Sequence, residues 1–241
     1  MRWQLARLVD AHPETATART LTLELDSWPG ALPGQHVDLR LTAEDGYSTQ
    51  RSYSLAEVGD SGRVRLTIQR LADGEVSPFL ADELAIGDEI ELRGPVGGWF
   101  VWDPADTDPV LLVAGGSGVV PLMAMLRARR SSDSKAPFRL VYSVRQQADV
   151  YYAEELGEIA ATGRDVETVI VYSRVAPPGI ARAAQRVTAA DLQAPGWEAG
   201  SGPRCYVCGS TGFVESVTQA LVHLGHDPQR IRTERFGPSG G

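Results

Sequence analysis

A glycine-rich segment at Gly115–Pro121, with the sequence GGSGVVP, follows an apolar run that begins at Val110. Glycines let a backbone approach a pyrophosphate closely, and a helix N-terminus offers free N–H groups to it. A tight strand-to-helix turn that binds nothing could have the same glycines. The strand pattern before the segment and the helical pattern after it favour a dinucleotide site. The contacts would come from Gly115, Gly116 and Gly118.

A second polar motif, Arg51-Ser52-Tyr53-Ser54, lies in a segment with strand character. Arg51 can pair with a phosphate through two N–H groups, and Tyr53, on the same strand face, can stack on a planar ring. The alternative is a surface arginine beside a half-buried tyrosine. Because alternate residues of a strand point to opposite faces, the spacing does not place Ser54 on the same ligand.

Cysteine and histidine contribute no predicted metal site. Cys205 and Cys208 form a C-x-x-C pattern, but residues three apart on a strand point to opposite faces, so they should neither bond each other nor share a metal. Two cysteines also cannot ligate an iron–sulfur cluster. The four histidines are scattered, and we expect His223 and His226, near a helix end, to be solvated. No Ser/His/Asp set supports hydrolase chemistry.

The first part of the chain has the pattern of a β-barrel or sandwich. Leucine, valine and isoleucine alternate with polar residues over 21–25, 37–41, 64–68 and 90–92, with Pro-Gly and Asp-Gly turns between them. One helix is predicted after Ser77, where Phe79, Leu80 and Leu84 recur at helical spacing and Gly87 follows as its end.

The second part has the pattern of a five-stranded parallel sheet with crossover helices. Its apolar runs are separated by about 25–39 residues, close to the roughly 30 residues of a βαβ unit. They begin near Val110, Phe138, Val166, Cys205 and Arg230. We therefore predict two domains, 1–103 and 104–241, with their boundary within Trp102–Pro109.

Charge and hydropathy exclude several classes of protein. The net charge of the 241 residues is −8, and it lies wholly in 1–103, which hold 9 Arg and 17 acidic residues. This balance argues against nucleic acid or an anionic membrane as the main partner. No apolar run approaches the roughly 20 residues that span a bilayer, and the N-terminus lacks a signal-peptide core. We expect a cytoplasmic protein and a monomer.

Five motifs in this order resemble those of the ferredoxin–NADP reductase superfamily of flavin-dependent reductases. They are RxYS at 51–54, GxxS at 74–77, GPxGxF at 94–100 with one extra residue before Phe100, GGxGxxP at 115–121 and CG(S/P) at 208–210. The resemblance covers nearly the whole chain. It implies an N-terminal antiparallel flavin-binding barrel with one helix and a C-terminal Rossmann-like α/β domain.

The resemblance also assigns roles in the flavin site. Arg51 would hold the flavin diphosphate, Tyr53 would stack on the isoalloxazine ring, and Ser54 would hydrogen-bond near flavin N5. Gly74, Val76 and Ser77 would present backbone and hydroxyl donors to the phosphates. A role for Ser77 as a plain helix N-cap is compatible with this. The remaining flavin contacts would be Ser52, Ile68 and Arg70.

The nucleotide site is expected where the second and third parallel strands end. Ser143 and Arg145 stand at the first of these ends, and Ser173 and Arg174 at the second, with no acidic residue before Asp149. Ligands bind at such strand ends in open α/β sheets. Each arginine alone could be a solvated surface residue; together they favour NADP(H), with Arg186 a possible third cation and NAD(H) the alternative.

The resemblance places Cys208 and Gly209 beside the nicotinamide, whereas Cys205 is interpreted as a core residue. The alternative for Cys208 is also a small buried core residue. Near the C-terminus, Glu234 matches an acid of the plant-type reductases, and Phe236 would cover the flavin. Packing of Phe236 on the last strand is the alternative. The catalytic residues implied are therefore Ser54, Cys208, Glu234 and Phe236.

The function implied is electron transfer from NAD(P)H, with NADPH favoured, through FAD, with FMN the alternative. Hydride would pass from nicotinamide C4 to flavin N5, and electrons would leave singly. Because the chain lacks cluster cysteines, the acceptor would be a separate ferredoxin, flavodoxin or oxygenase component. Alternatives are a subunit of a larger dehydrogenase, a free-flavin reductase, or a non-catalytic nucleotide-binding scaffold. Arg51 and Tyr53 argue against the scaffold.

Overall fold

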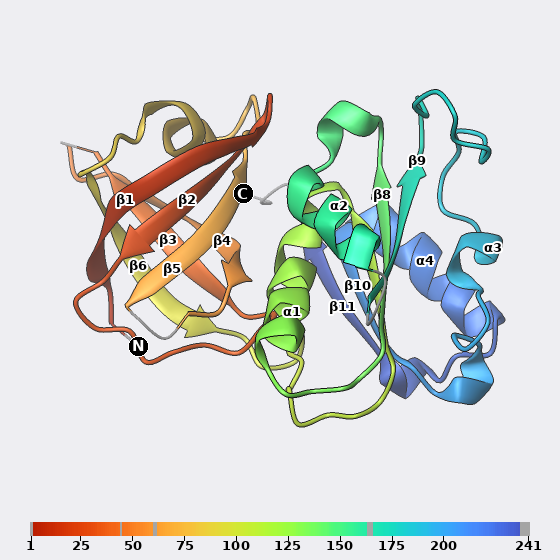
Figure 1. Cartoon of the computed structure of the whole chain (residues 1–241). Coiled ribbons are helices and arrows are strands. Elements are labelled where there is room, and N and C mark those ends of the chain that lie inside the picture. Colours follow the sequence, from red (N-terminus) through yellow and green to blue (C-terminus); the bar gives the residue numbers. More distant parts are fainter. Residues whose placement is uncertain (1, 44, 60–61, 163–165, 237–241) are drawn as a thin grey trace.

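The computed structural model describes residues 2–43, 45–59, 62–162 and 166–236. A β-barrel and a layered α/β sheet lie side by side, with one helix between them (Figure 1). Within the described residues, no helix is both long and apolar enough to cross a membrane.

The barrel is closed and contains six strands in the order β1-β2-β5-β4-β3-β6, with all neighbours antiparallel. These are β1 (Gln4–Thr15), β2 (Ala18–Glu24), β3 (His36–Thr42), β4 (Ser48–Glu57), β5 (Arg63–Gln69) and β6 (Glu89–Val96). The predicted antiparallel barrel is therefore confirmed. Strand β1 was not predicted, because its apolar residues do not alternate clearly with polar ones. Ala6 and Leu8 are buried, but the neighbouring Leu5, which is also apolar, is exposed.

Strand β4 is paired unevenly on its two sides. It pairs with β3 from Ser48 to Ser54, but its register with β5 includes only Leu55 and Glu57. The part of β4 that contains the RxYS motif therefore has one backbone edge outside the ladder with β5. Such an edge offers unused N–H and C=O groups to a ligand.

The helix after Ser77 is shorter than the sequence predicted. It is a five-residue π-helix, Phe79–Glu83. Arg19 donates hydrogen bonds to the carbonyl oxygens of Leu80 (3.3 Å) and Leu84 (2.9 Å), which satisfies groups at the helix end. The prediction that Gly87 ends the helix is wrong: it lies in the turn before β6, with φ +101°.

The second body is a parallel sheet in the order β11-β10-β7-β8-β9, which confirms the predicted five strands. Its strands are β7 (Val110–Gly115), β8 (Phe138–Val144), β9 (Val166–Tyr172), β10 (Arg204–Ser210) and β11 (Ile231–Phe236). Its α-helices are α1 (Val119–Ser131), α2 (Ala153–Thr162), α3 (Ala189–Leu192) and α4 (Thr211–His223). Short 3-10 turns occupy Gly116–Gly118, Gln147–Asp149, Ala199–Ser201 and Pro228–Arg230.

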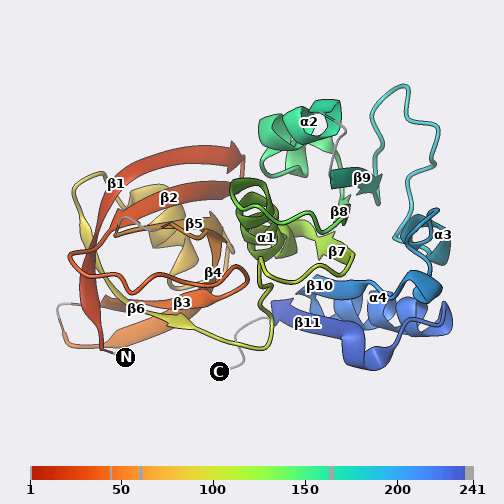
Figure 2. The same cartoon turned by 60° about the horizontal axis from the view of Figure 1, so that its bottom comes forward.

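Helix α1 lies between the barrel and the sheet, and α4 covers the opposite face (Figure 2). The core around α1 includes Ala18 and Ala56 from the barrel, together with Phe100 and Trp102 from the connection between the bodies. Both bodies thus contribute to the core around α1, whereas the interior of the barrel forms a cluster of its own. The domain boundary at Trp102–Pro109 stays a prediction.

The two cysteines of β10 belong to different faces of the sheet, as their spacing predicted. Cys208 packs in the core on the α1 side, and Cys205 packs in the core under α4. The prediction of a solvated His226 is wrong: it is buried, with Nδ1 3.9 Å from the Cys205 sulfur. The turn that follows α4 brings His226 back against β10, and its N–H donates to the Leu221 carbonyl oxygen at 3.1 Å. Sequence spacing does not indicate this contact.

Gly34 provides a stability test at the junction of barrel, connection and α1. An added Cβ would lie 1.9 Å from the Phe100 carbonyl oxygen and 2.7 Å from Met125 Cε. Gly30 has a similar positive φ but open space around it. We expect Gly34→Ala to lower the free energy of unfolding by about 1–3 kcal/mol more than Gly30→Ala, because only the former overpacks the core. Urea unfolding of both variants measures this, and equal losses would contradict the close approach.

Candidate active site

The structure brings Arg51 of β4 to the predicted phosphate loop at residues 74–77. The Arg51 guanidinium lies 3.4 Å from a carboxylate oxygen of Glu75 and also donates to the Thr49 hydroxyl at 3.1 Å. Glu75 further accepts a hydrogen bond from the Tyr47 hydroxyl at 3.3 Å. The two motifs therefore meet across the open edge of β4, although they lie more than twenty residues apart.

Within that loop, Ser77 does not cap the following helix as one interpretation had it. Its hydroxyl accepts a hydrogen bond from the Leu71 N–H at 3.1 Å instead. A Cβ at Gly74 would lie 2.8 Å from this hydroxyl oxygen, so a glycine allows the loop to close on itself. The Val76 side chain is fully buried in the barrel core, which leaves only its backbone to face a ligand.

Of three other predicted flavin contacts, Ile68 and Arg70 lie at the end of β5, whereas the Ser52 side chain faces β3. The Ile68 side chain is fully buried in the barrel core, so it too could contribute only its backbone. Arg70 is exposed and forms an ion pair with Asp82 at 3.2 Å. The Ser52 hydroxyl donates to Asp38 at 2.6 Å on the side of β4 that faces β3.

Tyr53 and Ser54 supply a ring and a hydroxyl at the end of this edge. Burial raises the pKa of Tyr53, so its half-buried phenol stays neutral. The Ser54 hydroxyl is buried and has no hydrogen-bond partner among the described residues. A buried polar atom without a partner costs about 1–3 kcal/mol, which is tolerated where a ligand provides the missing bond.

Glu234 approaches the same region from the C-terminal strand. Its Oε1 atom lies 3.9 Å from Nδ1 of His36, the residue that pairs with Ser54 across β3 and β4, and its Oε2 atom has no partner among the described residues. Burial raises the pKa of Glu234 to about 7 and lowers the pKa of His36. His36 was not predicted as a site residue, because it belongs to no motif and its pairing with Ser54 depends on the register of β3 with β4, which the sequence does not give.

Cys208 lies beside Glu234, as its partner in the β10–β11 register. Burial, together with the nearby Glu234 carboxyl, raises the pKa of the Cys208 thiol well above its usual range, so it remains protonated. A Cβ at Gly118 would lie 2.2 Å from the Cys208 carbonyl oxygen. Only glycine allows the start of α1 to pack this closely on β10.

The glycine-rich segment lies where the strand order changes direction, between β7 and β10. Open α/β sheets bind ligands at such a switch point. Phe213, at the start of α4, packs over this edge: a Cβ at Gly115 or Gly209 would lie 2.7 or 2.9 Å from its ring. Sequence reasoning missed Phe213, because no motif residue indicates which way the first turn of α4 faces.

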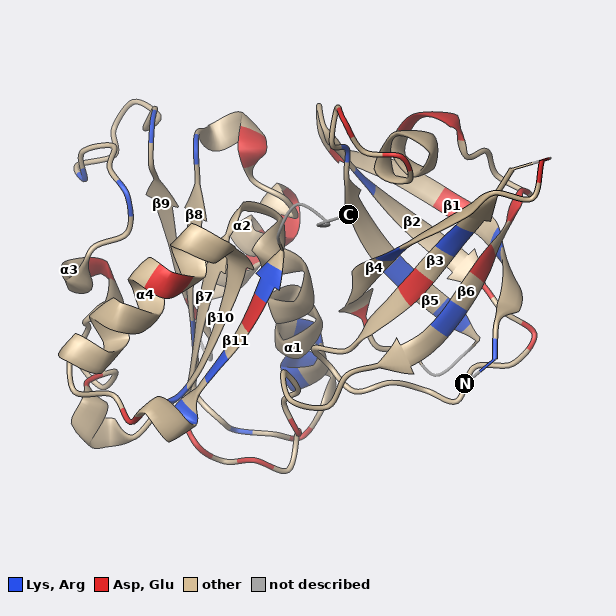
Figure 3. Cartoon of the chain, turned by 180° about the vertical axis from the view of Figure 1, so that it is seen from behind, with Lys and Arg blue, Asp and Glu red and all other residues tan. Residues whose placement is uncertain are grey.

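The two predicted nucleotide arginines are neighbours through their backbones. The Arg174 N–H donates to the Arg145 carbonyl oxygen at 3.0 Å, and the Ser173 N–H donates to Val144 at 2.8 Å. Both arginine side chains are exposed, and neither forms an ion pair with another described residue. Figure 3 shows basic segments at these ends of β8 and β9. Ser143, the last residue but one of β8, pairs with Gly115, while Arg186 is exposed farther along the loop.

Phe236 ends β11 and is half-buried against the core on the α1 side of the sheet. This contact agrees with its alternative interpretation as a packing residue. The residues that follow it, 237–241, lie outside the described residues.

The polar groups converge at the junction of barrel and sheet, which is the arrangement of a two-domain oxidoreductase with flavin and nucleotide sites. Among the described residues, no cluster of three or more His, Cys, Asp or Glu side chains could hold a metal. The oxidoreductase FAD-binding domain family matches residues 6–101, and the oxidoreductase NAD-binding domain family matches residues 112–219. The chain belongs to the ferredoxin reductase-like superfamily, with an oxidoreductase FAD-binding domain followed by an oxidoreductase NAD-binding domain.

Similar proteins include oxygenase reductases. The ferredoxin--NAD(P)(+) reductase component of a Ralstonia naphthalene 1,2-dioxygenase/salicylate 5-hydroxylase system is 30% identical over 208 residues, 86% of this chain and 61% of the relative. The Amycolatopsis cytochrome P450 reductase GcoB has a TM-score of 0.83 and 28% identity, with 99% of this chain and 71% of that chain covered. The FAD/NAD-binding domain of Vibrio cholerae nitric oxide dioxygenase shares the fold, with a TM-score of 0.84, 24% identity and 98% and 99% coverage. The chain spans about 61% of the length of the Ralstonia relative.

The buried Glu234 carboxyl should make stability depend on pH. It ionises near pH 4.5 in the unfolded chain and near 7 in the folded one, so the folded state holds one more proton between these values. Stability therefore falls as pH rises through this range. We expect the free energy of unfolding of Glu234→Gln, relative to that of the parent, to rise by up to about 3 kcal/mol from pH 5 to pH 8.

Urea unfolding at the two pH values measures this gain. Glu215→Gln, which replaces an exposed acid on α4, is the matched control and should show no such trend. If the parent and Glu234→Gln keep the same stability difference at both pH values, the carboxyl ionises normally in the folded protein.

Proposed function

We propose that this chain binds FAD and NADP(H) and passes electrons from NADPH to a separate one-electron acceptor. The observation that carries the proposal is the pair of buried, unpartnered atoms, the Ser54 hydroxyl and Glu234 Oε2, contributed by barrel and sheet at one junction. Residues 1–103 would form the flavin domain and 104–241 the nucleotide domain, with the division inside the connection from β6 to β7.

The residues present fit a flavin dinucleotide. Arg51 and the N–H groups of the 74–77 loop offer donors to its diphosphate, and the open edge of β4 offers backbone groups along the ring. Tyr53 offers a neutral aromatic face for stacking. For Arg51 to bind phosphate it must exchange the Glu75 carboxylate for the phosphate oxygens of the flavin. FAD is favoured over FMN because residues 6–101 match an FAD-binding domain.

Bound FAD would supply the chemistry, accepting hydride from the nicotinamide and releasing electrons singly. The protein would orient the reactants and control protons. The Ser54 hydroxyl has its hydrogen available for an acceptor, and Glu234 can hold or release a proton near neutral pH. The protonated Cys208 thiol would give the nicotinamide an uncharged, unreactive neighbour, whereas a thiolate at this position would be a nucleophile.

Arg145 and Arg174 support the choice of NADP(H). Their side chains are exposed at adjacent strand ends, so both are available to a 2′-phosphate on the adenosine ribose. Ser143 and Ser173 stand next to them, and Gly115, Gly116 and Gly118 lie at the switch point that would hold the pyrophosphate.

The acceptor is proposed to be a ferredoxin, flavodoxin or oxygenase component. Similarity to a dioxygenase reductase component and to a cytochrome P450 reductase supports an oxygenase-linked role. We further propose that the protein works as a cytoplasmic monomer.

The first test is reconstitution of the full chain with FAD followed by anaerobic mixing with NADPH. We expect a yellow protein that NADPH bleaches and ferricyanide reoxidises. Arg51→Gln should raise the FAD dissociation constant about 10- to 100-fold, the loss expected for a charge-assisted bond to phosphate. Arg63→Gln, on an exposed barrel arginine paired with Glu24, should leave FAD affinity unchanged. A parent chain that binds neither FAD nor FMN rules out the reductase.

Nucleotide choice is tested by Arg174→Ala and Arg145→Ala. Each should raise the KM for NADPH about 10-fold or more and leave the KM for NADH within about twofold, because NADH lacks the 2′-phosphate. Lys135→Ala, which removes an exposed cation just before the opposite end of β8, is the control. An unchanged NADPH-to-NADH ratio in both arginine variants would show that neither binds the 2′-phosphate.

A further inference from the structure

Tyr152, the residue before α2, is the one non-glycine residue with positive φ in the part of the chain that the structure describes. Its φ is 55°, and its side chain is almost fully buried. A left-handed conformation is unfavourable for an ordinary residue, because its Cβ comes too close to the following carbonyl oxygen. Such strain persists only where surrounding contacts hold it, and it concentrates at functional positions.

The backbone of Tyr152 is held by the barrel. Its N–H donates to Glu14 Oε2 at 2.9 Å, although Glu14 lies on β1, 138 residues earlier. The Glu14 side chain is 9% exposed and faces the N-terminus of α2, where the helix dipole stabilises a carboxylate. His12 also contacts this carboxylate, with its Nε2 3.1 Å from Oε1.

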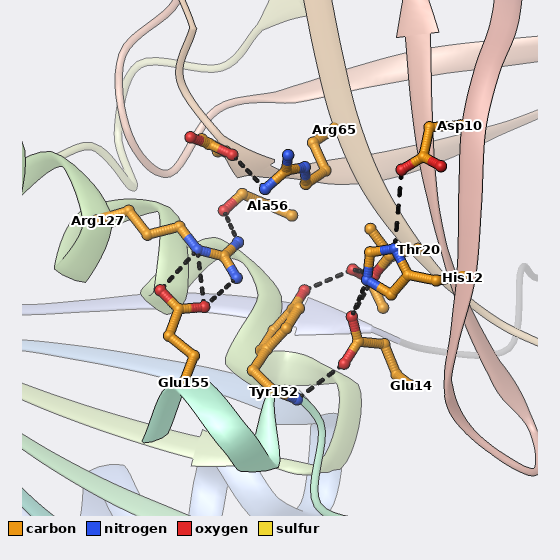
Figure 4. Close-up of polar contacts among 11 residues, drawn as sticks. Asp10, His12, Glu14, Thr20, Ala56, Arg65, Arg127, Tyr152 and Glu155 are labelled. Carbon is orange, nitrogen blue, oxygen red and sulfur yellow. Dashed lines mark hydrogen bonds and ion pairs between the residues drawn. The ribbon is translucent and has the colours of Figure 1, made fainter. Parts of the chain in front are cut away.

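The Tyr152 hydroxyl is held by the same carboxylate through two threonines (Figure 4). It lies 2.5 Å from the Thr67 hydroxyl, which lies 2.7 Å from the Thr20 hydroxyl, which donates to Glu14 Oε1 at 2.6 Å. An ionised carboxylate only accepts, so each hydroxyl must donate toward Glu14. The hydrogen bonds form a closed ring that fixes both ends of Tyr152 to the barrel.

Arg127 of α1 extends this ring to the strand that contains the flavin motif. Its guanidinium lies 4.6 Å from the centre of the Tyr152 ring and binds Glu155 of α2 with contacts of 2.5 and 3.1 Å. It also donates to the Ala56 carbonyl oxygen at 2.7 Å. Ala56 is two residues beyond Ser54 on β4, and α1 starts directly after Gly118.

We propose that Glu14, Tyr152 and Arg127 are positioning residues that set the distance between nicotinamide and flavin by locking the sheet to the barrel. This inference rests on the proposed function. Hydride transfer needs the reacting atoms about 3–3.5 Å apart, and a displacement of about 1 Å can slow a reaction about 100-fold. A rigid link between β4 and α1 limits such displacement, because these elements lead to the two sites.

The test compares Tyr152→Phe and Arg127→Lys with matched controls in the FAD-loaded full chain. Tyr151→Phe alters a neighbouring buried tyrosine, and Arg130→Lys alters a cation on α1 that reaches Glu155 but has no barrel contact among the described residues. In anaerobic stopped flow, Tyr152→Phe and Arg127→Lys, here called the clamp variants, should show flavin reduction by saturating NADPH that is about 10- to 100-fold slower than in the parent. FAD and NADP+ dissociation constants should stay within about twofold, and the controls should match the parent.

Two further readouts separate positioning from mere stabilisation. The long-wavelength charge-transfer absorbance of the flavin–nicotinamide pair should weaken in the clamp variants. In flavin-free protein, hydrogen exchange at the first turn of α2 should be at least about 10-fold faster in Tyr152→Phe than in Tyr151→Phe. Reduction at the parental rate in folded clamp variants would overturn the proposal, even if their melting temperature falls. A parent chain that binds FAD but is not reduced by NADPH or NADH would instead overturn the proposed function, and this inference with it.

Discussion

The arrangement of the site depends on how strand β4 is held. It pairs with β3 along the RxYS motif, whereas its register with β5 is confined to Leu55 and Glu57, and its end is bonded to α1 through Arg127. The strand is thus open along one edge and fixed at its end. An open edge alone would be a weak point of the barrel; held this way, it can receive a ligand without losing register.

Desolvation at the barrel–sheet junction decides the chemistry of the side chains there. Burial keeps Tyr53 and Cys208 neutral and moves the ionisation of Glu234 to about pH 7. Leaving the Ser54 hydroxyl and a Glu234 oxygen without partners costs stability. A bound ligand that provided the missing partners would offset this cost, and this is the physical basis of the proposal that flavin and nucleotide bind at this junction.

The nucleotide side depends on close backbone packing. Because Gly118 and Gly115 have no side chains, the start of α1 and the end of β7 can approach β10 and Phe213 closely. The same packing fixes Cys208 beside α1. The ring of hydrogen bonds around Tyr152 adds direct contacts between this body and the barrel, although the two have different architectures.

The sequence by itself determined the classes of structure and the motifs. Period-two alternation predicted most barrel strands, the 25–39-residue spacing predicted the five parallel strands, and the RxYS and glycine-rich motifs pointed to the two ligand sites, because these signals are local. Only the tertiary structure decided that His36 and Glu234 meet, that Glu14 holds Tyr152, and that Arg19 ends the helix after Ser77. Such contacts arise from barrel closure and strand register, and protonation follows from the burial they create. Neither can be read from spacing along the chain.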